Sequence, residues 1–102
     1  RLLGVVDGDT VDLSIDLGFR IWMTVRVRII GVNCPEMHGG EAGKLAKSFT
    51  QDWFANHVGT VQVKTYLDKR DSFGRVLTEV WSGEESLGQR LIESGHAVPF
   101  SR

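Results

Sequence analysis

The sequence has one cysteine, two prolines, and no apolar run that approaches the ~20 residues needed to span a membrane. A single thiol, Cys34, excludes an intramolecular disulfide and a zinc site built from several thiolates. Because no membrane-length segment is present, we expect no membrane partner. No feature of the sequence selects among a secreted, an intracellular and a phage-encoded protein.

An excess of basic charge is also lacking, since twelve Lys and Arg stand against thirteen Asp and Glu, a formal net charge of -1. This balance argues against a protein that holds nucleic acid mainly through a broad basic surface. Acidic residues gather early and basic ones follow: Asp7, Asp9, Asp12 and Asp16, then Arg20, Arg26 and Arg28. That order suits a site where a cation and a phosphate meet.

With 102 residues, 41% of them hydrophobic, the chain has the size and composition of one ordinary globular domain. We therefore expect a single domain over residues 1–102 and a monomer. β-Branched and aromatic residues predict strands at 2–6, 10–15, 21–30, 60–66 and 76–81. Apolar residues at three- and four-residue spacings predict a helix from Glu41 to about His57, and a shorter one from Ser86 to Glu93.

This order predicts an α+β fold: a five-stranded OB-fold-like β-barrel with one helix after the third strand and a second after the fifth. Asp7-Gly8 indicates a tight hairpin turn in which glycine supplies a positive φ. Gly59 and Gly95 are expected to end the two helices. Residues 67–75 read as a polar loop, and Trp53 and Trp81 as core residues.

The third predicted strand places Val25, Val27 and Ile29 on one face, with Arg26 and Arg28 on the other. Arg28 and Arg75 are either solvated surface charges or a two-armed clamp, since guanidinium groups bind phosphate oxygens bidentately.

Asp9 follows the predicted hairpin turn, where its carboxylate is either part of the turn or an oxygen ligand for a hard cation such as Ca²⁺. Asn33, Cys34 and Glu36 form either a loop that ends a strand or a further set of oxygens, namely an amide, a backbone carbonyl and a carboxylate. Cys34 itself has no histidine placed by sequence to activate it, so a small semi-buried thiol is favoured over a nucleophile.

Three segments, VDGDTV at 6–11, RIIGVNCPE at 28–36 and DSFGR at 71–75, resemble the staphylococcal nuclease (thermonuclease) family in order and spacing. The likeness covers nearly the whole chain and implies a Ca²⁺-dependent nuclease that hydrolyses phosphodiester bonds to leave 3′-phosphate ends. Its implied substrate is single-stranded or denatured DNA, with RNA as a further candidate.

By this resemblance Asp9, the side chain of Asn33 and the carbonyl of Cys34 are calcium ligands. Glu36 is the general base that positions or activates the attacking water, and Arg28 and Arg75 hold the phosphate. Each role agrees with the chemistry, because a metal neutralises charge, a carboxylate accepts a proton and arginines stabilise the transition state.

The sequence departs from the staphylococcal enzyme at several positions. Asn33 stands in place of an Asp, which removes a negative charge and should weaken calcium binding while keeping an oxygen ligand. Cys34 replaces a Thr, a neutral change if only the backbone oxygen binds. Ser72 and Phe73 replace a Lys and a Tyr that contact a second phosphate. The loop after Glu36 is shorter, and a third helix is expected to be missing.

Two functions follow from these observations. The first is a nuclease that uses Arg28, Glu36 and Arg75 for catalysis. The alternative is a catalytically degenerate module of the same family that binds nucleic acid or protein without cleaving. Retention of all three residues favours the enzyme.

Overall fold

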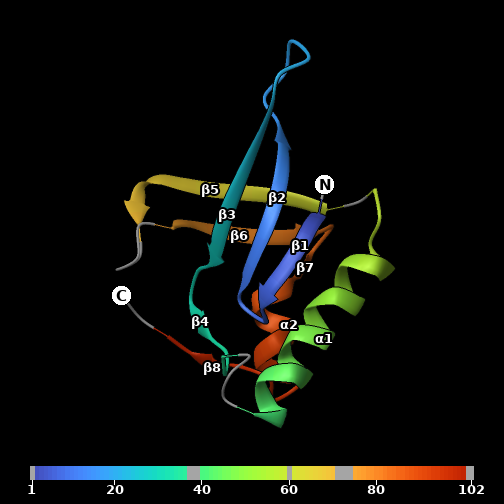
Figure 1. The fold of residues 1–102 in the computed structure, drawn as a ribbon, viewed down its shortest axis with the longest axis vertical. Coiled ribbons are helices and arrows are strands. Elements are labelled where there is room, and N and C mark those ends of the chain that lie inside the picture. The colour runs from blue at the N-terminus through green and yellow to red at the C-terminus, as the bar shows by residue number, and fades with distance from the viewer. Residues whose placement is uncertain (1, 37–39, 60, 71–74, 101–102) are drawn as a thin grey trace.

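The computed structural model describes residues 2–36, 40–59, 61–70 and 75–100 (Figure 1). Its elements, in chain order, are β1 (Leu2–Asp7), β2 (Thr10–Asp16), β3 (Trp22–Ile29), β4 (Val32–Asn33), α1 (Glu41–Asn56), β5 (Val61–Arg70), β6 (Val76–Ser82), β7 (Glu85–Ser86), α2 (Leu87–Glu93) and β8 (Val98–Pro99). The predicted α+β class and both helices are confirmed.

The main sheet has the strand order β1-β2-β3-β6-β5, with β7 paired to β6 (Figure 1). All neighbours are antiparallel except β3 and β6, which run parallel over Val27–Ile29 and Val76–Thr78. A second, two-stranded sheet joins β4 to β8 through the pairs Val32↔Pro99 and Asn33↔Val98. These last pairs connect the middle of the chain to its end.

The predicted closure into a barrel is wrong. Within the described residues, β1 and β5 are the two edges of an open sheet. Leu2 on β1, Val61 on β5 and Phe54 on α1 line one apolar groove. α1 therefore reaches both edge strands in this groove and packs against β1, while the described strands β1 and β5 do not pair with each other.

The core lies between the sheet and the two helices, which sit together at one end of the molecule (Figure 1). It is made of these buried residues: Val11, Leu13, Val27, Ile29, Val32, Cys34, Ala46, Trp53, Phe54, Val76, Val80, Leu87, Leu91 and Ala97. The inward face predicted for Val25, Val27 and Ile29 is confirmed, with Val25 partly buried.

Trp53 is buried as predicted, but Trp81 is not a core residue. Along β6, Val76 and Val80 face the core, so the odd-numbered Trp81 points to the opposite face. Its indole N–H donates to Glu79 at 3.0 Å. The alternation of side chains along the strand decides the orientation of Trp81, whereas the prediction was based on the hydrophobicity of its indole.

The helix ends agree with the sequence to within a residue. α2 starts after Ser86, whose hydroxyl accepts a hydrogen bond from the backbone N–H of Gln89 at 3.3 Å. Gly95 adopts a φ of 82°, as expected for a glycine after a helix. β5, however, continues to Arg70, so the predicted loop at 67–75 is a strand over its first four residues. Residues 71–74 lie outside the described part of the chain.

Candidate active site

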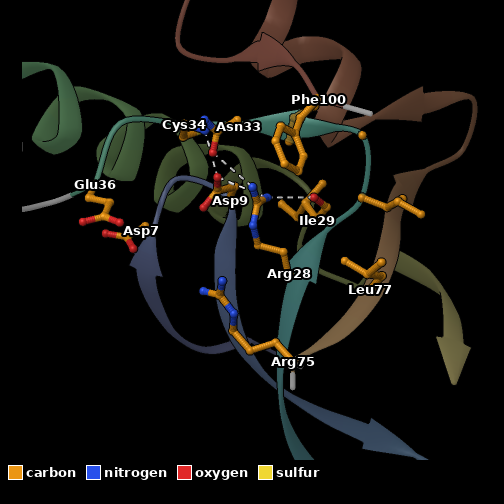
Figure 2. A pocket seen from close by; sticks show the side chains of 13 residues that line it. Asp7, Asp9, Arg28, Ile29, Asn33, Cys34, Glu36, Arg75, Leu77 and Phe100 are labelled. Carbon is orange, nitrogen blue, oxygen red and sulfur yellow. Dashed lines mark hydrogen bonds and ion pairs between the residues drawn. The ribbon is translucent and has the colours of Figure 1, made fainter. Parts of the chain in front are cut away.

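One pocket of about 170 Å³ lies where the β1–β2 turn, the end of β3, the segment after β4 and the start of β6 converge (Figure 2). All six residues predicted for the site line it: Asp9, Arg28, Asn33, Cys34, Glu36 and Arg75. They come from four separate segments of the chain. The pocket therefore brings carboxylates and arginines together as the sequence predicts.

The β1–β2 turn is fixed by contact with α1. Gly8 has no positive φ, so the conformational reason predicted for this glycine is wrong. A Cβ at Gly8 would instead lie 2.8 Å from Cβ of Ala46 and 3.0 Å from Sγ of Cys34. The Thr50 hydroxyl also donates to the Gly8 carbonyl at 2.6 Å. Glycine is required here for a close approach to the helix, and this approach places Asp9 in the pocket.

Asp9 is a buried carboxylate whose oxygens have protein partners. Its Oδ2 accepts the backbone N–H of Cys34 at 2.8 Å and lies 3.1 Å from Nη1 of Arg28. Its Oδ1 accepts from the Thr10 hydroxyl at 3.3 Å. The hydrogen bond to Cys34 ties the turn to the segment after β4, so Asp9 positions this segment.

Arg28 is also buried, only 8% exposed, and its guanidinium lies between groups of opposite or partial negative charge (Figure 2). Beside the ion pair with Asp9, Nη1 donates to the Ile29 carbonyl at 3.0 Å and Nη2 donates to Oδ1 of Asn33 at 3.2 Å. The ring of Phe100 lies 6.0 Å from Cζ. Removing either member of such a buried pair typically costs about 3–5 kcal/mol of stability.

Cys34 is a buried thiol, as its sequence context predicts. Burial, followed by the nearby Asp9 carboxylate, raises the pKa of Cys34 to about 12. The thiol is therefore protonated at neutral pH, which does not suit a nucleophile.

Arg75 approaches the pocket from the start of β6, and its Nη1 donates to the Thr10 hydroxyl at 3.2 Å. Glu36 lies on the other side, where Figure 2 shows its carboxylate pointing toward that of Asp7. Asp7 also lines the pocket, although the sequence was interpreted as placing it in a turn and among the early acidic residues, not in the site. Its position in the segment VDGDTV, two residues before Asp9, was the signal available for including it.

Phe100 is a second lining residue that the sequence did not predict. Its backbone N–H donates to the Gly31 carbonyl at 2.9 Å, next to the β4–β8 ladder. No local sequence pattern predicts the position of Phe100, because it depends on a pairing between residues far apart in the chain.

The pocket is lined by residues with carboxylate, amide and backbone carbonyl oxygens, namely Asp9, Asn33 and Cys34. Such hard oxygens are the ligands that Ca²⁺ binds. Asp9 and Asn33 contact the same guanidinium through different nitrogens, since Oδ2 of Asp9 lies 3.1 Å from Nη1 of Arg28 and Oδ1 of Asn33 lies 3.2 Å from Nη2. The two groups thus already share a cation. Among the described residues no group of three His, Cys, Asp or Glu side chains gathers to hold a metal. A hard cation bound here would have to take amide or backbone oxygens besides the Asp9 carboxylate.

The structure is thus an α+β domain with an open sheet and a pocket that gathers arginines and carboxylates. The model of the staphylococcal nuclease homologue family matches residues 26–101, and the chain belongs to this family. An OB-like fold is the fold that this family implies, with a sheet that is not closed in the described residues.

Several relatives carry nuclease names. The chain is 33% identical over 98 residues to "Thermonuclease" of Staphylococcus intermedius, covering 91% of this chain and 54% of the relative. It is 31% identical over 104 residues to "Thermonuclease" of Staphylococcus hyicus, covering 95% and 56%. It is 31% identical over 84 residues to "Probable endonuclease lcl3" of Botryotinia fuckeliana, covering 76% and 31%. The chain thus spans about a third to about half of the length of these relatives.

Proposed function

We propose that this domain is a nuclease that hydrolyses phosphodiester bonds in single-stranded or denatured DNA, and in RNA, to leave 3′-phosphate ends. The observation that carries the proposal is the pocket itself, whose lining includes Glu36, Arg28 and Arg75 together with Asp9, Asn33 and Cys34. The family and the nuclease names of the relatives support the same reaction.

In the proposed mechanism, Arg28 and Arg75 bind the phosphate oxygens and stabilise the charge that develops at phosphorus. Glu36 accepts a proton from a water molecule, whose oxygen forms a bond to phosphorus while the bond to the 5′-oxygen breaks. The 5′-oxygen leaves with a proton from solvent, and the phosphate remains on the 3′ side.

Asp9, the side chain of Asn33 and the carbonyl of Cys34 would hold Ca²⁺, which when bound supplies positive charge next to the phosphate. The Arg28 guanidinium, which lies beside oxygens of Asp9 and Asn33, adds a second positive charge near the phosphate. Arg28 can bind a phosphate only through the part of its guanidinium that faces the pocket. The ion pair with Asp9 and the hydrogen bond to Asn33 fix the orientation of the Arg28 guanidinium.

The test is cleavage of a single-stranded DNA oligonucleotide in Ca²⁺, in Mg²⁺ and in chelator, with analysis of the product ends. We expect calcium-dependent cleavage that leaves 3′-phosphates. Glu36→Gln should lower kcat by a factor of about 100 or more, because general-base catalysis contributes on that order. Glu84→Gln, which alters an exposed carboxylate outside the pocket, serves as the matched control and should keep the wild-type rate.

A second candidate is a module that binds nucleic acid without cleaving it. The neutral Asn33 and the engagement of Arg28 by Asp9 favour this alternative, because both reduce the negative charge available to a metal. Binding of the oligonucleotide without cleavage in any divalent metal, by a folded chain, would decide for the module. Equal rates for the wild type and Glu36→Gln would remove Glu36 from the mechanism.

A further inference from the structure

The hairpin between β2 and β3 extends beyond the rest of the sheet (Figure 1). β2 pairs with β1 only as far as Leu13, and β3 pairs with β6 only from Val27. Between these limits β2 and β3 pair only with each other, from Ser14↔Thr24 to Asp16↔Trp22. We call residues 14–24 the hairpin arm.

The end of the arm is apolar and exposed. Five of its large hydrophobic side chains are accessible to solvent: Leu17, Phe19, Ile21, Trp22 and Met23. Phe19 is 97% exposed. Exposed apolar residues gathered in one place mark interaction sites more often than residues scattered singly.

Two residues at the tip adopt a backbone conformation that is unfavourable for their side chains. Phe19 and Arg20 have φ values of 52° and 62°, and the N–H of Ile21 donates to the Gly18 carbonyl at 2.9 Å. Asn and Gly are the usual residues in such a turn, because other side chains are strained at positive φ. Phe19 and Arg20 are therefore disfavoured by the local fold, and both side chains are exposed.

We propose that the hairpin arm inserts its tip into the interfacial region of a lipid bilayer that contains anionic headgroups. The arm projects from the body and is convex, so it can enter a bilayer without a complementary groove. Aliphatic side chains gain from an acyl environment, whereas only the aromatic ones could stack on bases. Trp22, at the base of the tip, is of the type enriched at membrane interfaces.

The arm carries one basic and one acidic residue, and the basic one, Arg20, stands among the apolar side chains of the tip. Arg20 is exposed and lies between Phe19 and Ile21, where its guanidinium can reach headgroups while its neighbours enter the bilayer. The other charged residue of the tip, Asp16, accepts a hydrogen bond from the backbone N–H of Gly18 at 2.8 Å. This proposal departs from the expectation of no membrane partner, which was based on the lack of a membrane-length segment. It concerns surface binding only, since neither helix in the described ranges is long and apolar enough to cross a bilayer.

The test is sedimentation of the protein with vesicles of phosphatidylcholine, alone or mixed in equal parts with phosphatidylglycerol. Phe19→Asn should weaken partitioning by about tenfold, as expected for loss of one buried aromatic side chain. Asn tolerates positive φ, so this variant should fold like the wild type, which a thermal melt checks. Leu45→Asn is the matched control, because Leu45 is 53% exposed but lies on α1, outside the groove that Trp22 lines. It should partition like the wild type.

Two further measurements separate the sources of binding. Arg20→Asn should remove the preference for anionic vesicles and leave binding to phosphatidylcholine unchanged. Brominated lipids should quench the fluorescence of Trp22, which is exposed, and Trp22→Phe should abolish that quenching.

Equal partitioning of wild type and Phe19→Asn, or no partitioning of either, would overturn the proposal. A Phe19-dependent increase in mass by light scattering without vesicle binding would assign the arm to contacts with a second copy. Phe19-dependent binding of single-stranded DNA without vesicle binding would assign it to nucleic acid. None of these outcomes depends on whether the pocket cleaves DNA.

Discussion

Gly8 is the residue on which the position of Asp9 depends, because it lets the turn approach α1. We expect Gly8→Ala to lower the free energy of unfolding by about 1–3 kcal/mol, since its Cβ would overlap Ala46 and Cys34. Urea denaturation measures the change. Gly4→Ala is the control, because a Cβ at Gly4 meets nothing within 4 Å. If the two variants lose equal stability, the close approach is not what requires Gly8.

Cys34 offers a second test at the scale of one residue. Because burial raises its pKa to about 12, almost no thiolate is present near pH 8 in the folded protein. We expect modification by iodoacetamide to be far slower in native than in denatured protein. The native rate should keep rising with pH past the ordinary thiol pKa of 9.0 instead of levelling off there. A native rate that reaches a plateau near pH 9 would contradict the assigned environment.

The raised pKa of Cys34 also makes the free energy of unfolding depend on pH. The folded state favours the protonated thiol, so its contribution to stability is fully present below the ordinary pKa and is lost as pH rises toward 12.

The opposite dependence holds for Asp12, where the hydrogen bond from Arg26 lowers the carboxyl pKa. Its contribution is present above the usual Asp pKa and is lost as pH falls below it. This pair is largely exposed, so its effect should be small.

The residues of the pocket were predictable where they lie in short, contiguous motifs. Asp9, Glu36 and the arginines lie in the three segments that resemble the staphylococcal nuclease family, whereas residue chemistry alone left a structural interpretation open for each. Phe100 was not predictable, because its contact with Arg28 depends on the pairing of β8 with β4. The partners of Asp9 and Arg28 also escape sequence reasoning, since burial and hydrogen bonding are set by packing.

At the scale of elements, α2 depends on its first residue. We expect Ser86→Ala to lower the free energy of unfolding by about 1 kcal/mol, because it removes the acceptor for the Gln89 N–H. Ser86→Asp keeps an acceptor at the N-cap and should restore most of this loss. Urea denaturation of the two variants measures the difference. Equal losses would show that the hydroxyl contributes through its place in β7 instead of through the cap.

Helices were predicted to within a residue because apolar periodicity and flanking residues are local signals. The starts and ends of α1 and α2 depend on residues such as Ser86 and Gly95 that lie next to them. Strand ends were less predictable. β5 continues to Arg70 through residues that are polar, since its ladder with β6, which pairs Arg70 with Val76, outweighs their low strand propensity.

At the scale of the whole molecule, strand order and closure are decided by long-range contacts. The sequence predicted five strands but neither the small β4–β8 sheet nor the open edge between β1 and β5. Both features shape the structure, because β8 leads to Phe100 at the pocket and the open edge leaves α1 to cover the core. Only contacts between distant segments carry this information, and a single sequence does not contain it in local form.

Calcium binding should appear as a change in the stability of the whole domain. A ligand that binds only the folded state stabilises it by about 2.7 kcal/mol at a hundredfold excess over Kd, which corresponds to a rise in Tm of roughly 10 °C or more for a domain of this size. We expect the calcium-dependent rise to be larger for Asn33→Asp than for the wild type at the same concentration. A second carboxylate beside Asp9 strengthens the oxygen site.

The matched control is Asn56→Asp, which adds the same charge at the exposed end of α1, outside the pocket. Its calcium-dependent rise in Tm should equal that of the wild type. If Asn33→Asp and Asn56→Asp respond alike, Asn33 is not a ligand, because added charge alone would explain the change. If calcium leaves all three melting temperatures unchanged, Arg28 remains the cation that Asp9 and Asn33 share, and the binding module becomes the better description of the domain.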